Sequence, residues 1–378
     1  MGGMGMADTF THSLTPERRA TLALWAVPGL GPKTLEALRA FTGGSLARLL
    51  DSPVSEWLAE VPVSAPVRRR LAEIEALGPV ADQLLERSEV SGMELAFAGE
   101  YVFPERLAVT PEAPPVLFYK GNVGPPRRRV AMVGSRHPDQ GFLPFARTFA
   151  REVAEGGVGV VSGAAMGVDR ACHYGALDAG GETWAFLGSA LDALDEPQAR
   201  MLPEFLDRGG VYFSELPPGV RASRSTFPRR NRLIAGASDA VLVLRAGKES
   251  GALYTAEEGL ALERPVLALP GDVRNEAAVG CNELIRDGKA HACLGVKEVW
   301  KWVGARPELA VPPGAGESWQ ALSAEARGAY RLLDRVPRTF DEVLAGCRLS
   351  PAALTGALVE LELSGWVVQH PGKLYEKV

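Results

Sequence analysis

An arginine-rich turn is the part of this sequence best suited to binding an anion. The segment Phe227-Pro-Arg-Arg-Asn-Arg232 gathers three arginines within one helical turn. A spacing of three residues places Arg229 and Arg232 on one helix face, where they repel each other by roughly a few tenths of a kcal/mol unless an anion compensates. Phe227 can stack on a base, and Asn231 can hydrogen-bond a base edge or a phosphate. The segment therefore predicts a single-stranded DNA site; the alternative is a solvated basic turn paired with nearby acids.

Three turns of small residues add to this prediction. Gly134-Ser-Arg136, Ser162-Gly163 and Ser250-Gly251 each follow an apolar run with the composition of a buried strand. Open α/β sheets bind anions at the carboxyl ends of their parallel strands, where loops meet helix N-termini. Arg136 adds a guanidinium whose planar fork can form two parallel hydrogen bonds to a phosphate. One such turn can be an ordinary connection, but the recurrence of three predicts a shared phosphate site.

Other chemistries find less support in the sequence. A G-x-G-x-x-G motif with an acidic residue about 20 positions later is absent, which disfavours a nicotinamide dehydrogenase. His137 and His173 have no partners at metal-ligand spacing, so we expect structural or rim positions for both. Glu257 and Glu258 leave one alternative function, a nucleotide-processing hydrolase that resembles the lysine-decarboxylase-like Rossmann group. That group carries a fuller P-G-G-x-G-T motif than Gly247-Lys-Glu-Ser-Gly251, and we expect no catalytic residue, metal or cofactor.

Composition limits where a nucleic-acid site can lie. The formal net charge is -5 and 46% of the residues are apolar, so affinity for nucleic acid must come from a local basic patch. The four cysteines are scattered and form no C-x-x-C pair, which fits neither a disulfide framework nor a zinc module and favours a reducing cytoplasm. No apolar h-region opens the sequence, and no stretch of about 18 apolar residues predicts a membrane span.

The elements that must position these residues fall in the middle of the chain. Residues 96–300 alternate apolar, β-branched runs with helical stretches, and extra strands precede the first of them. This rhythm predicts an α/β fold with an extended Rossmann-like, mostly parallel sheet. The predicted strands are Val116–Tyr119, Val130–Val133, Gly159–Val161, Thr183–Leu187, Val211–Ser214, Ala240–Leu244 and Pro265–Leu269.

A small helical domain is expected before this sheet, over residues 14–95. Apolar residues recur three and four apart in several short stretches there. Val27-Pro-Gly-Leu-Gly-Pro-Lys-Thr34 resembles the helix-hairpin-helix turn that binds DNA phosphates. The alternative is a sharp connection between two helices in a domain of related shape. The domain is therefore described as similar to SAM or helix-hairpin-helix domains.

A linker and a winged-helix domain are expected after the sheet. Residues 301–318 are rich in Pro, Gly and Ala, and residues 319–378 have the helix and hairpin pattern of a winged helix, similar to the DML1 type. The predicted third helix, Pro351–Ser364, contains Glu360 and Glu362 but no Lys or Arg. Because such a helix contacts phosphates poorly, we expect a protein contact or an auxiliary DNA role, with Lys373 and Lys377 as the best DNA contacts if DNA binds there.

Taken together, these motifs closely resemble the DprA family, also called the DNA-processing protein A or Smf family. The resemblance extends from about Phe103 to Leu294, and the flanking regions fit the longer members. Met166 departs from the pattern, because many relatives have an arginine at this point after the serine-glycine turn. The stretches that carry the resemblance are Phe103–Leu107, Pro114–Gly121, Gly134–Arg136, Ser162–Gly163 with Gly167–Asp169, Phe227–Arg232, Ser250–Gly251, Pro270–Gly271 and Gly280–Arg286.

This resemblance implies a non-enzymatic mediator of recombination during natural transformation. Such a protein binds and protects incoming single-stranded DNA, helps to load RecA onto it and works as a cytoplasmic homodimer; double-stranded DNA and single-strand-binding protein are further possible partners. Arg136 and Arg229 are implied as the leading phosphate contacts. The DNA-binding residues predicted from motifs and resemblance together are Gly134, Ser135, Arg136, Ser162, Gly163, Phe227, Arg229, Arg230, Asn231, Arg232, Ser250 and Gly251.

Overall fold

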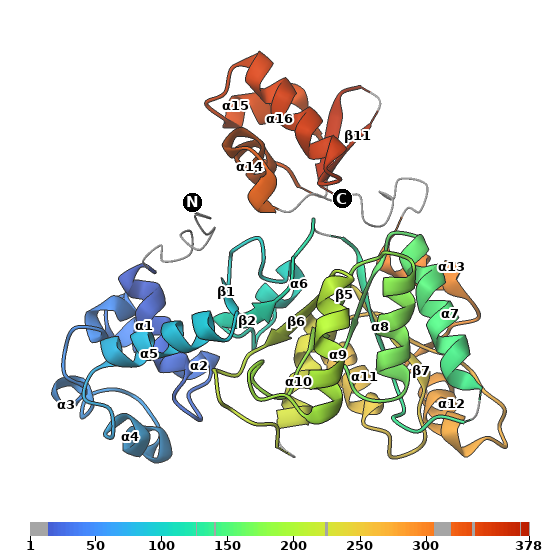
Figure 1. Cartoon of the computed structure of the whole chain (residues 1–378), viewed down its shortest axis with the longest axis horizontal. Coiled ribbons are helices and arrows are strands. Elements are labelled where there is room, and N and C mark those ends of the chain that lie inside the picture. The colour runs from blue at the N-terminus through green and yellow to red at the C-terminus, as the bar shows by residue number, and fades with distance from the viewer. Residues whose placement is uncertain are drawn as a thin grey trace, which may run out of the picture.

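The computed structural model describes residues 14–125, 127–139, 141–223, 226–305, 319–334, 337–370 and 372–377. Within these ranges, one sheet of nine strands forms the centre of the chain, in the order β1-β2-β6-β5-β4-β3-β7-β8-β9 (Figure 1). The strands are β1 (Glu94–Phe97), β2 (Val116–Lys120), β3 (Arg129–Gly134), β4 (Gly159–Ser162), β5 (Thr183–Phe186), β6 (Gly210–Ser214), β7 (Ala240–Arg245), β8 (Val266–Ala268) and β9 (His291–Ala292).

Most of this sheet is parallel, which confirms the predicted fold class. Every neighbouring pair from β6 to β9 runs parallel, whereas β1 with β2 and β2 with β6 are antiparallel. Chain order runs outward from β3 in one direction through β4, β5 and β6, and in the other through β7, β8 and β9. Between β3 and β7 the order therefore reverses, which is where ligands bind in doubly wound sheets.

Helices cover both faces of the sheet. Alternate residues of one strand enter different cores: Val116 and Phe118 of β2 face one layer, and Leu117 and Tyr119 face the other. The first layer contains α7 (Phe142–Glu155), α8 (Val168–Asp178), α9 (Glu196–Asp207) and α13 (Val296–Val303). The second contains α6 (Glu105–Ala108), α10 (Thr226–Gly236), α11 (Ala252–Ala261) and α12 (Val279–Arg286), the last preceded by η2 (Glu276–Ala278).

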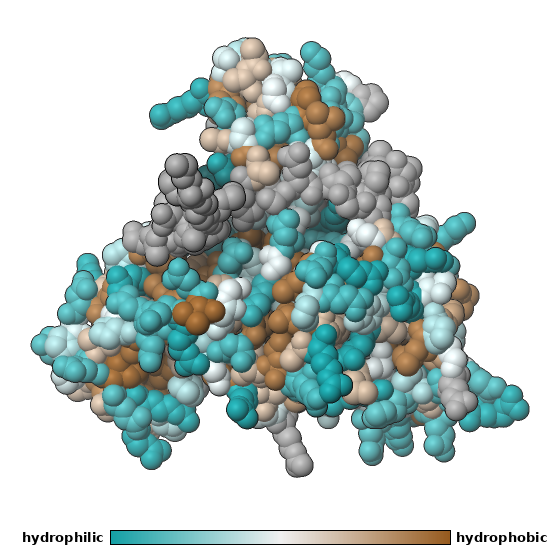
Figure 2. All heavy atoms as spheres, viewed as in Figure 1, coloured by the Kyte–Doolittle hydropathy of each residue, from teal (hydrophilic) through white to brown (hydrophobic). Residues whose placement is uncertain are grey.

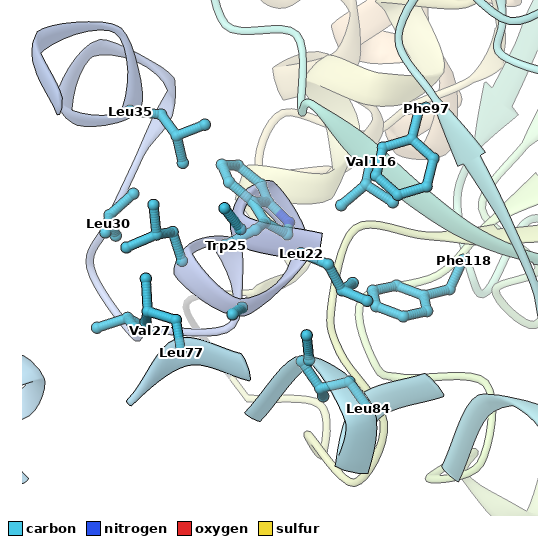
Figure 3. Close-up of a cluster of buried hydrophobic side chains, with 14 of the residues drawn as sticks. Leu22, Trp25, Val27, Leu30, Leu35, Leu77, Leu84, Phe97, Val116 and Phe118 are labelled. Carbon is cyan, nitrogen blue, oxygen red and sulfur yellow. The ribbon is translucent and has the colours of Figure 1, made fainter. Parts of the chain in front are cut away.

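The N-terminal helices form a cluster beside β1 and β2 (Figure 1). They share one apolar core with the sheet, because Leu22 and Leu84 pack with Phe118 (Figure 3), and the Trp25 indole N–H donates to Glu215 O at 2.9 Å. The fourteen-residue helix α5 was not predicted, and β1 starts at Glu94, inside the expected helical domain. The cluster comprises α1 (Pro16–Trp25), α2 (Pro32–Phe41), η1 (Leu46–Leu49), α3 (Val54–Trp57), α4 (Ala65–Leu71) and α5 (Leu77–Val90).

The turn similar to a helix-hairpin-helix motif joins α1 to α2. Gly29 has φ of +85°, a conformation that favours glycine, and Gly31 precedes the first residue of α2. A guanidinium nitrogen of Arg70 in α4 donates to Pro28 O at 2.5 Å. The structure thus places a tight turn between the two helices as expected, and its contact with DNA stays a prediction.

The C-terminal region has the helices and hairpin of a winged helix. Its sheet order is β10-β12-β11, and the short strand β10 was not predicted. Trp366 is fully buried in the centre of this region, and Tyr101 of the central region stacks on Trp319 at a centroid distance of 4.3 Å. The elements are η4 (Trp319–Ala321), α14 (Ala324–Arg331), β10 (Arg338–Thr339), α15 (Phe340–Gly346), α16 (Pro351–Leu363), β11 (Val367–His370) and β12 (Leu374–Lys377).

Of the predicted linker, residues 301–303 belong to α13 and residues 306–318 lie outside the described ranges. No helix among the described residues is long and apolar enough to cross a membrane. All four cysteines are free thiols, and three of them are buried. In the space-filling view, hydrophilic side chains cover much of the visible face, with smaller apolar areas between them (Figure 2).

Candidate phosphate-binding site

Loops from neighbouring strands meet at the carboxyl edge of the sheet. The loop after β4 lies directly against the loop after β3: a side chain added at Gly167 would come within 2.5 Å of the carbonyl oxygens of Ser135 and Arg136. Gly167 also has φ of +88°. Ser135 N donates to Arg245 O at the end of β7, at 2.7 Å. The ends of β3, β4 and β7 are therefore held together by close backbone contacts.

The arginine-rich segment forms the start of α10, which crosses this edge. The Arg136 guanidinium carbon lies 5.4 Å from the centroid of the Phe227 ring, within the range of a cation–π contact. Phe227 in turn packs against Gly188 after β5, where an added Cβ would meet the ring at 3.2 Å. At the other side of the helix, the Asn231 side-chain amide lies 3.5 Å from Gly251 O. We call this convergence of Arg136, Gly163, Gly188, Phe227 and Gly251, together with Arg229 in the first turn of α10, the strand-end site.

Two arginines of the strand-end site are available to a ligand. Arg136 and Arg229 are exposed, and neither forms an ion pair with any residue in the described ranges. Ser250 and Gly251 are half-buried and exposed, respectively, so the turn after β7 is also open to solvent. An exposed guanidinium without an acidic partner is a ready donor to phosphate oxygens.

The other two arginines of the motif point elsewhere. Arg230 is only 5% exposed, and its Nη1 donates to Phe186 O at 2.6 Å. Burial lowers the pKa of Arg230 to about 10, although the charge of Asp169 acts in the opposite direction. Arg232 is held by Glu112 O at 2.8 Å and by the Glu215 carboxylate. Both side chains were predicted to contact DNA directly, and in this structure they bind other parts of the protein.

Asp169 joins the ends of two strands beneath the site. Its carboxylate accepts hydrogen bonds from Gly134 N at 3.4 Å and from Gly163 N at 3.2 Å. Burial raises the pKa of Asp169, and the positive charge of Arg230 opposes this rise. Ser162 is fully buried and its hydroxyl donates to Met132 O at 2.7 Å. The Ser162 hydroxyl and the Gly163 amide, which were predicted to contact DNA, therefore form hydrogen bonds within the protein.

The two histidines occupy different environments. His137 is exposed, whereas His173 is fully buried and burial lowers its pKa to about 3. His173 Nδ1 lies 2.7 Å from the Thr183 hydroxyl, which itself donates to Val160 O, and Nε2 accepts from Ala164 N at 3.3 Å. These partners fix a neutral imidazole with its proton on Nδ1. His173 therefore supports the loop after β4, in agreement with its expected structural role.

Sequence reasoning missed Gly188 as a member of the site. It follows the predicted strand Thr183–Leu187 directly, which is the same glycine-after-strand pattern that identified Gly134 and Gly163. Met166 is 52% exposed on the loop after β4, so its departure from the family pattern changes the chemistry of an accessible surface. Glu257 is exposed on α11, and burial raises the pKa of the half-buried Glu258.

Fold and site define an α/β protein of the doubly wound type with exposed arginines at the carboxyl edge of its sheet and an appended winged helix. The family model for DNA recombination-mediator protein A matches residues 94–304, and that for the DprA winged helix domain matches residues 313–373. The chain therefore belongs to the DNA recombination-mediator protein A (DprA/Smf) family. These matches confirm the resemblance stated from the motifs.

Individual relatives agree with this assignment. Protein Smf of Synechocystis is 31% identical over 330 residues, which cover 78% of this chain and 83% of that protein. A putative DNA processing protein DprA of Mycobacterium tuberculosis is 38% identical over 248 residues, covering 65% of this chain and 64% of that protein. The X-ray structure of DprA from Streptococcus pneumoniae aligns with a TM-score of 0.62 and 25% identity, covering 76% of this chain and 98% of that one.

Proposed function

We propose that this chain binds single-stranded DNA at the strand-end site and passes it to a recombinase without catalysing a reaction. One observation carries the proposal: Arg136 and Arg229 are exposed and unpaired with any described acid, and Arg136 lies beside the Phe227 ring where the loops meet. Exposed cations on the same edge as an aromatic ring suit a strand whose phosphates and unstacked bases are both accessible. A duplex hides its base faces, so it would make less use of Phe227.

The contacts divide by chemistry. Arg136 and Arg229 hold phosphates, Phe227 stacks on a base, and Asn231 with the turn Ser250–Gly251 supplies hydrogen bonds to the strand. The remaining predicted residues support the site through contacts within the protein; they are Gly134, Ser162, Gly163, Arg230 and Arg232. Ser135 contributes backbone geometry, because its amide and carbonyl are both used in internal hydrogen bonds.

Family membership supports a proposal for the partners and the location of this protein. A recombination mediator of this family is proposed to act as a homodimer, to protect incoming DNA during natural transformation and to load RecA onto it. Single-strand-binding protein and double-stranded DNA are further proposed partners. We place this activity in the cytoplasm, where four free thiols are stable. The functional units proposed from the sequence are 14–95, 96–300 and 319–378, and the sheet strand β1 and helix α13 extend the central unit to residues 94–303.

Charge reversal at the two exposed arginines tests the proposal. Arg136→Glu and Arg229→Glu should each weaken binding of fluorescent oligothymidylate by about tenfold or more, equivalent to about 1.4 kcal/mol, in anisotropy titrations at fixed salt. Arg151→Glu is the matched control: the Arg151 side chain is 48% exposed near the C-terminal end of α7, the helix that leads back from the carboxyl edge of the sheet. Unchanged affinity in both site variants, or an equal loss in the control, would contradict the site.

A further inference from the structure

Adjacent arginines at the start of α10 have opposite environments. Arg229 is exposed, whereas Arg230 is buried, with Nη1 bound to Phe186 O at 2.6 Å. A Cβ placed at Gly163 would lie only 1.9 Å from Nη1, so the guanidinium occupies the space that any larger residue would need. Arg230 is therefore part of the packing between α10 and the ends of β4 and β5.

Burial of this guanidinium is not explained by its hydrogen bonds alone. Its Nε is buried and has no hydrogen-bond partner among the described residues. A buried charge is costly unless an opposite charge compensates it. Asp169, itself only 6% exposed, is the acid that attracts Arg230, and each of the two charges favours the ionised form of the other.

Asp169 also binds the backbone at the ends of two strands. Its two oxygens accept from Gly134 N and Gly163 N, at the ends of β3 and β4. Arg230, three residues after Phe227, binds the end of β5 and so restricts rotation of the first turn of α10. The pair thus connects three strand ends to the helix that presents Phe227 and Arg229.

We propose that Asp169 and Arg230 are positioning residues for single-stranded DNA, which hold Phe227, Arg229 and the strand ends in binding geometry without contacting phosphate. This inference rests on the proposed function of the strand-end site. It separates the two arginines by role: Arg229 neutralises a DNA phosphate, while Arg230 is buried with Nη1 bound to Phe186 O. A buried guanidinium that touches no phosphate releases no counterions when DNA binds.

Salt dependence distinguishes positioning from contact. Arg136→Met removes a phosphate contact, so it should weaken oligothymidylate binding and reduce the magnitude of the slope of log K against log salt by about 0.7. Arg230→Met should weaken binding by about tenfold, because the supporting shell is lost, but leave the slope at its wild-type value. Each variant is compared in anisotropy titrations over a series of KCl concentrations, after near-ultraviolet circular dichroism has confirmed native packing.

A second variant covers the case in which Arg230→Met does not fold. Gly163→Ala adds one methyl group against Nη1 and changes no charge, so it should also weaken binding while leaving the slope unchanged. Gly328→Ala is its control: Gly328 lies within α14 of the winged-helix region, and nothing lies within 4 Å of the added Cβ. We expect Gly328→Ala to bind oligothymidylate within about twofold of wild type, because the added methyl meets no neighbour.

The possible results separate the two proposals. A slope reduced by Arg230→Met as much as by Arg136→Met would show a direct phosphate contact and overturn the positioning role. Wild-type affinity in folded Arg230→Met, or in Gly163→Ala, would overturn it as well, while the effect of Arg136→Met would leave the site itself standing. Failure of the wild-type protein to bind oligothymidylate would instead refute the proposed function and with it this inference.

Discussion

The strand-end site and the winged-helix region offer contrasting surfaces, although both are architectures that bind DNA in other proteins. At the strand ends, Arg136 and Arg229 are exposed and unpaired with any described acid. On α16, the third helix of the winged helix, Val359 and Leu363 are 47% and 78% exposed, and Glu360 accepts from both the backbone and the hydroxyl of Ser323 at 2.6 Å.

This difference teaches that architecture alone does not locate a DNA site. A surface of exposed apolar side chains and carboxylates repels phosphate and suits a protein partner better. A winged helix can thus be kept in a DNA-processing protein for reasons other than direct DNA contact. If this contrast is correct, damage to the two regions should have separable consequences, for stability in one and for DNA affinity in the other.

The largest effect should follow truncation of the winged-helix core. Trp366 is fully buried and its ring lies 5.2 Å from Trp319 and 5.4 Å from Tyr330. Trp366→Ala should lower the free energy of unfolding of this region by about 3–5 kcal/mol, as is typical for a buried aromatic residue. Urea unfolding followed by tryptophan fluorescence measures this loss, and Val359→Ala on the exposed side of α16 serves as control.

Oligothymidylate affinity should survive the same change. Because the strand-end site has its own core, we expect Trp366→Ala to stay within about twofold of wild type under conditions where the central region is folded. A tenfold loss of oligothymidylate affinity would mean that the winged helix contributes to DNA binding, and the contrast between the two regions would be wrong.

The second-largest effect is expected from acid, which should destabilise the loop after β4 that His173 holds in place. The buried imidazole of His173 has a pKa of about 3 in the folded protein, compared with 6.5 for the unperturbed side chain. The unfolded chain therefore binds the extra proton first: the stabilisation is complete above about pH 6.5 and declines towards pH 3, by up to about 1.4 kcal/mol per pH unit. The raised pKa of Asp169 acts with the opposite sign in the acidic part of this window.

A variant without the imidazole isolates this contribution. His173→Gln retains hydrogen-bonding groups but cannot titrate, so its unfolding free energy should fall less than that of the wild type between about pH 7 and pH 5. Urea titrations at the two pH values provide the comparison. Equal decreases in both proteins would show that His173 is not the group responsible.

The sequence predicted the sheet well because its strands are local, apolar and bounded by turns. Thr183–Leu187, for example, was expected as a strand and β5 spans Thr183–Phe186. It did not predict that Trp25 would bind Glu215 O and join the N-terminal helices to the sheet core, since such a contact links residues 190 positions apart. Local patterns carry no information on packing at that separation.

The same limit applies within the site. The motifs predicted that Arg136, Phe227 and the glycine turns lie at one edge of the sheet, and in the structure they are neighbours there. Yet it could not tell Arg229 from Arg230, because the rotation of α10 relative to the sheet decides which guanidinium faces solvent. That rotation depends on Phe186 O and Gly163, which lie on other strands and become neighbours only in the folded protein.

The smallest effect is expected at the wing, and it completes the contrast. Lys373 is exposed beside β12 with φ of +56°, whereas Lys377 lies 4.5 Å from the centroid of the Tyr330 ring. If the winged helix does not hold the strand, Lys373→Glu should change oligothymidylate affinity by less than about twofold, or about 0.4 kcal/mol, and leave the salt slope unchanged. Arg229→Glu, measured in parallel, provides the opposite result at the strand ends. A tenfold loss from Lys373→Glu with a reduced slope would instead assign a phosphate contact to the wing, despite the acidic character of α16.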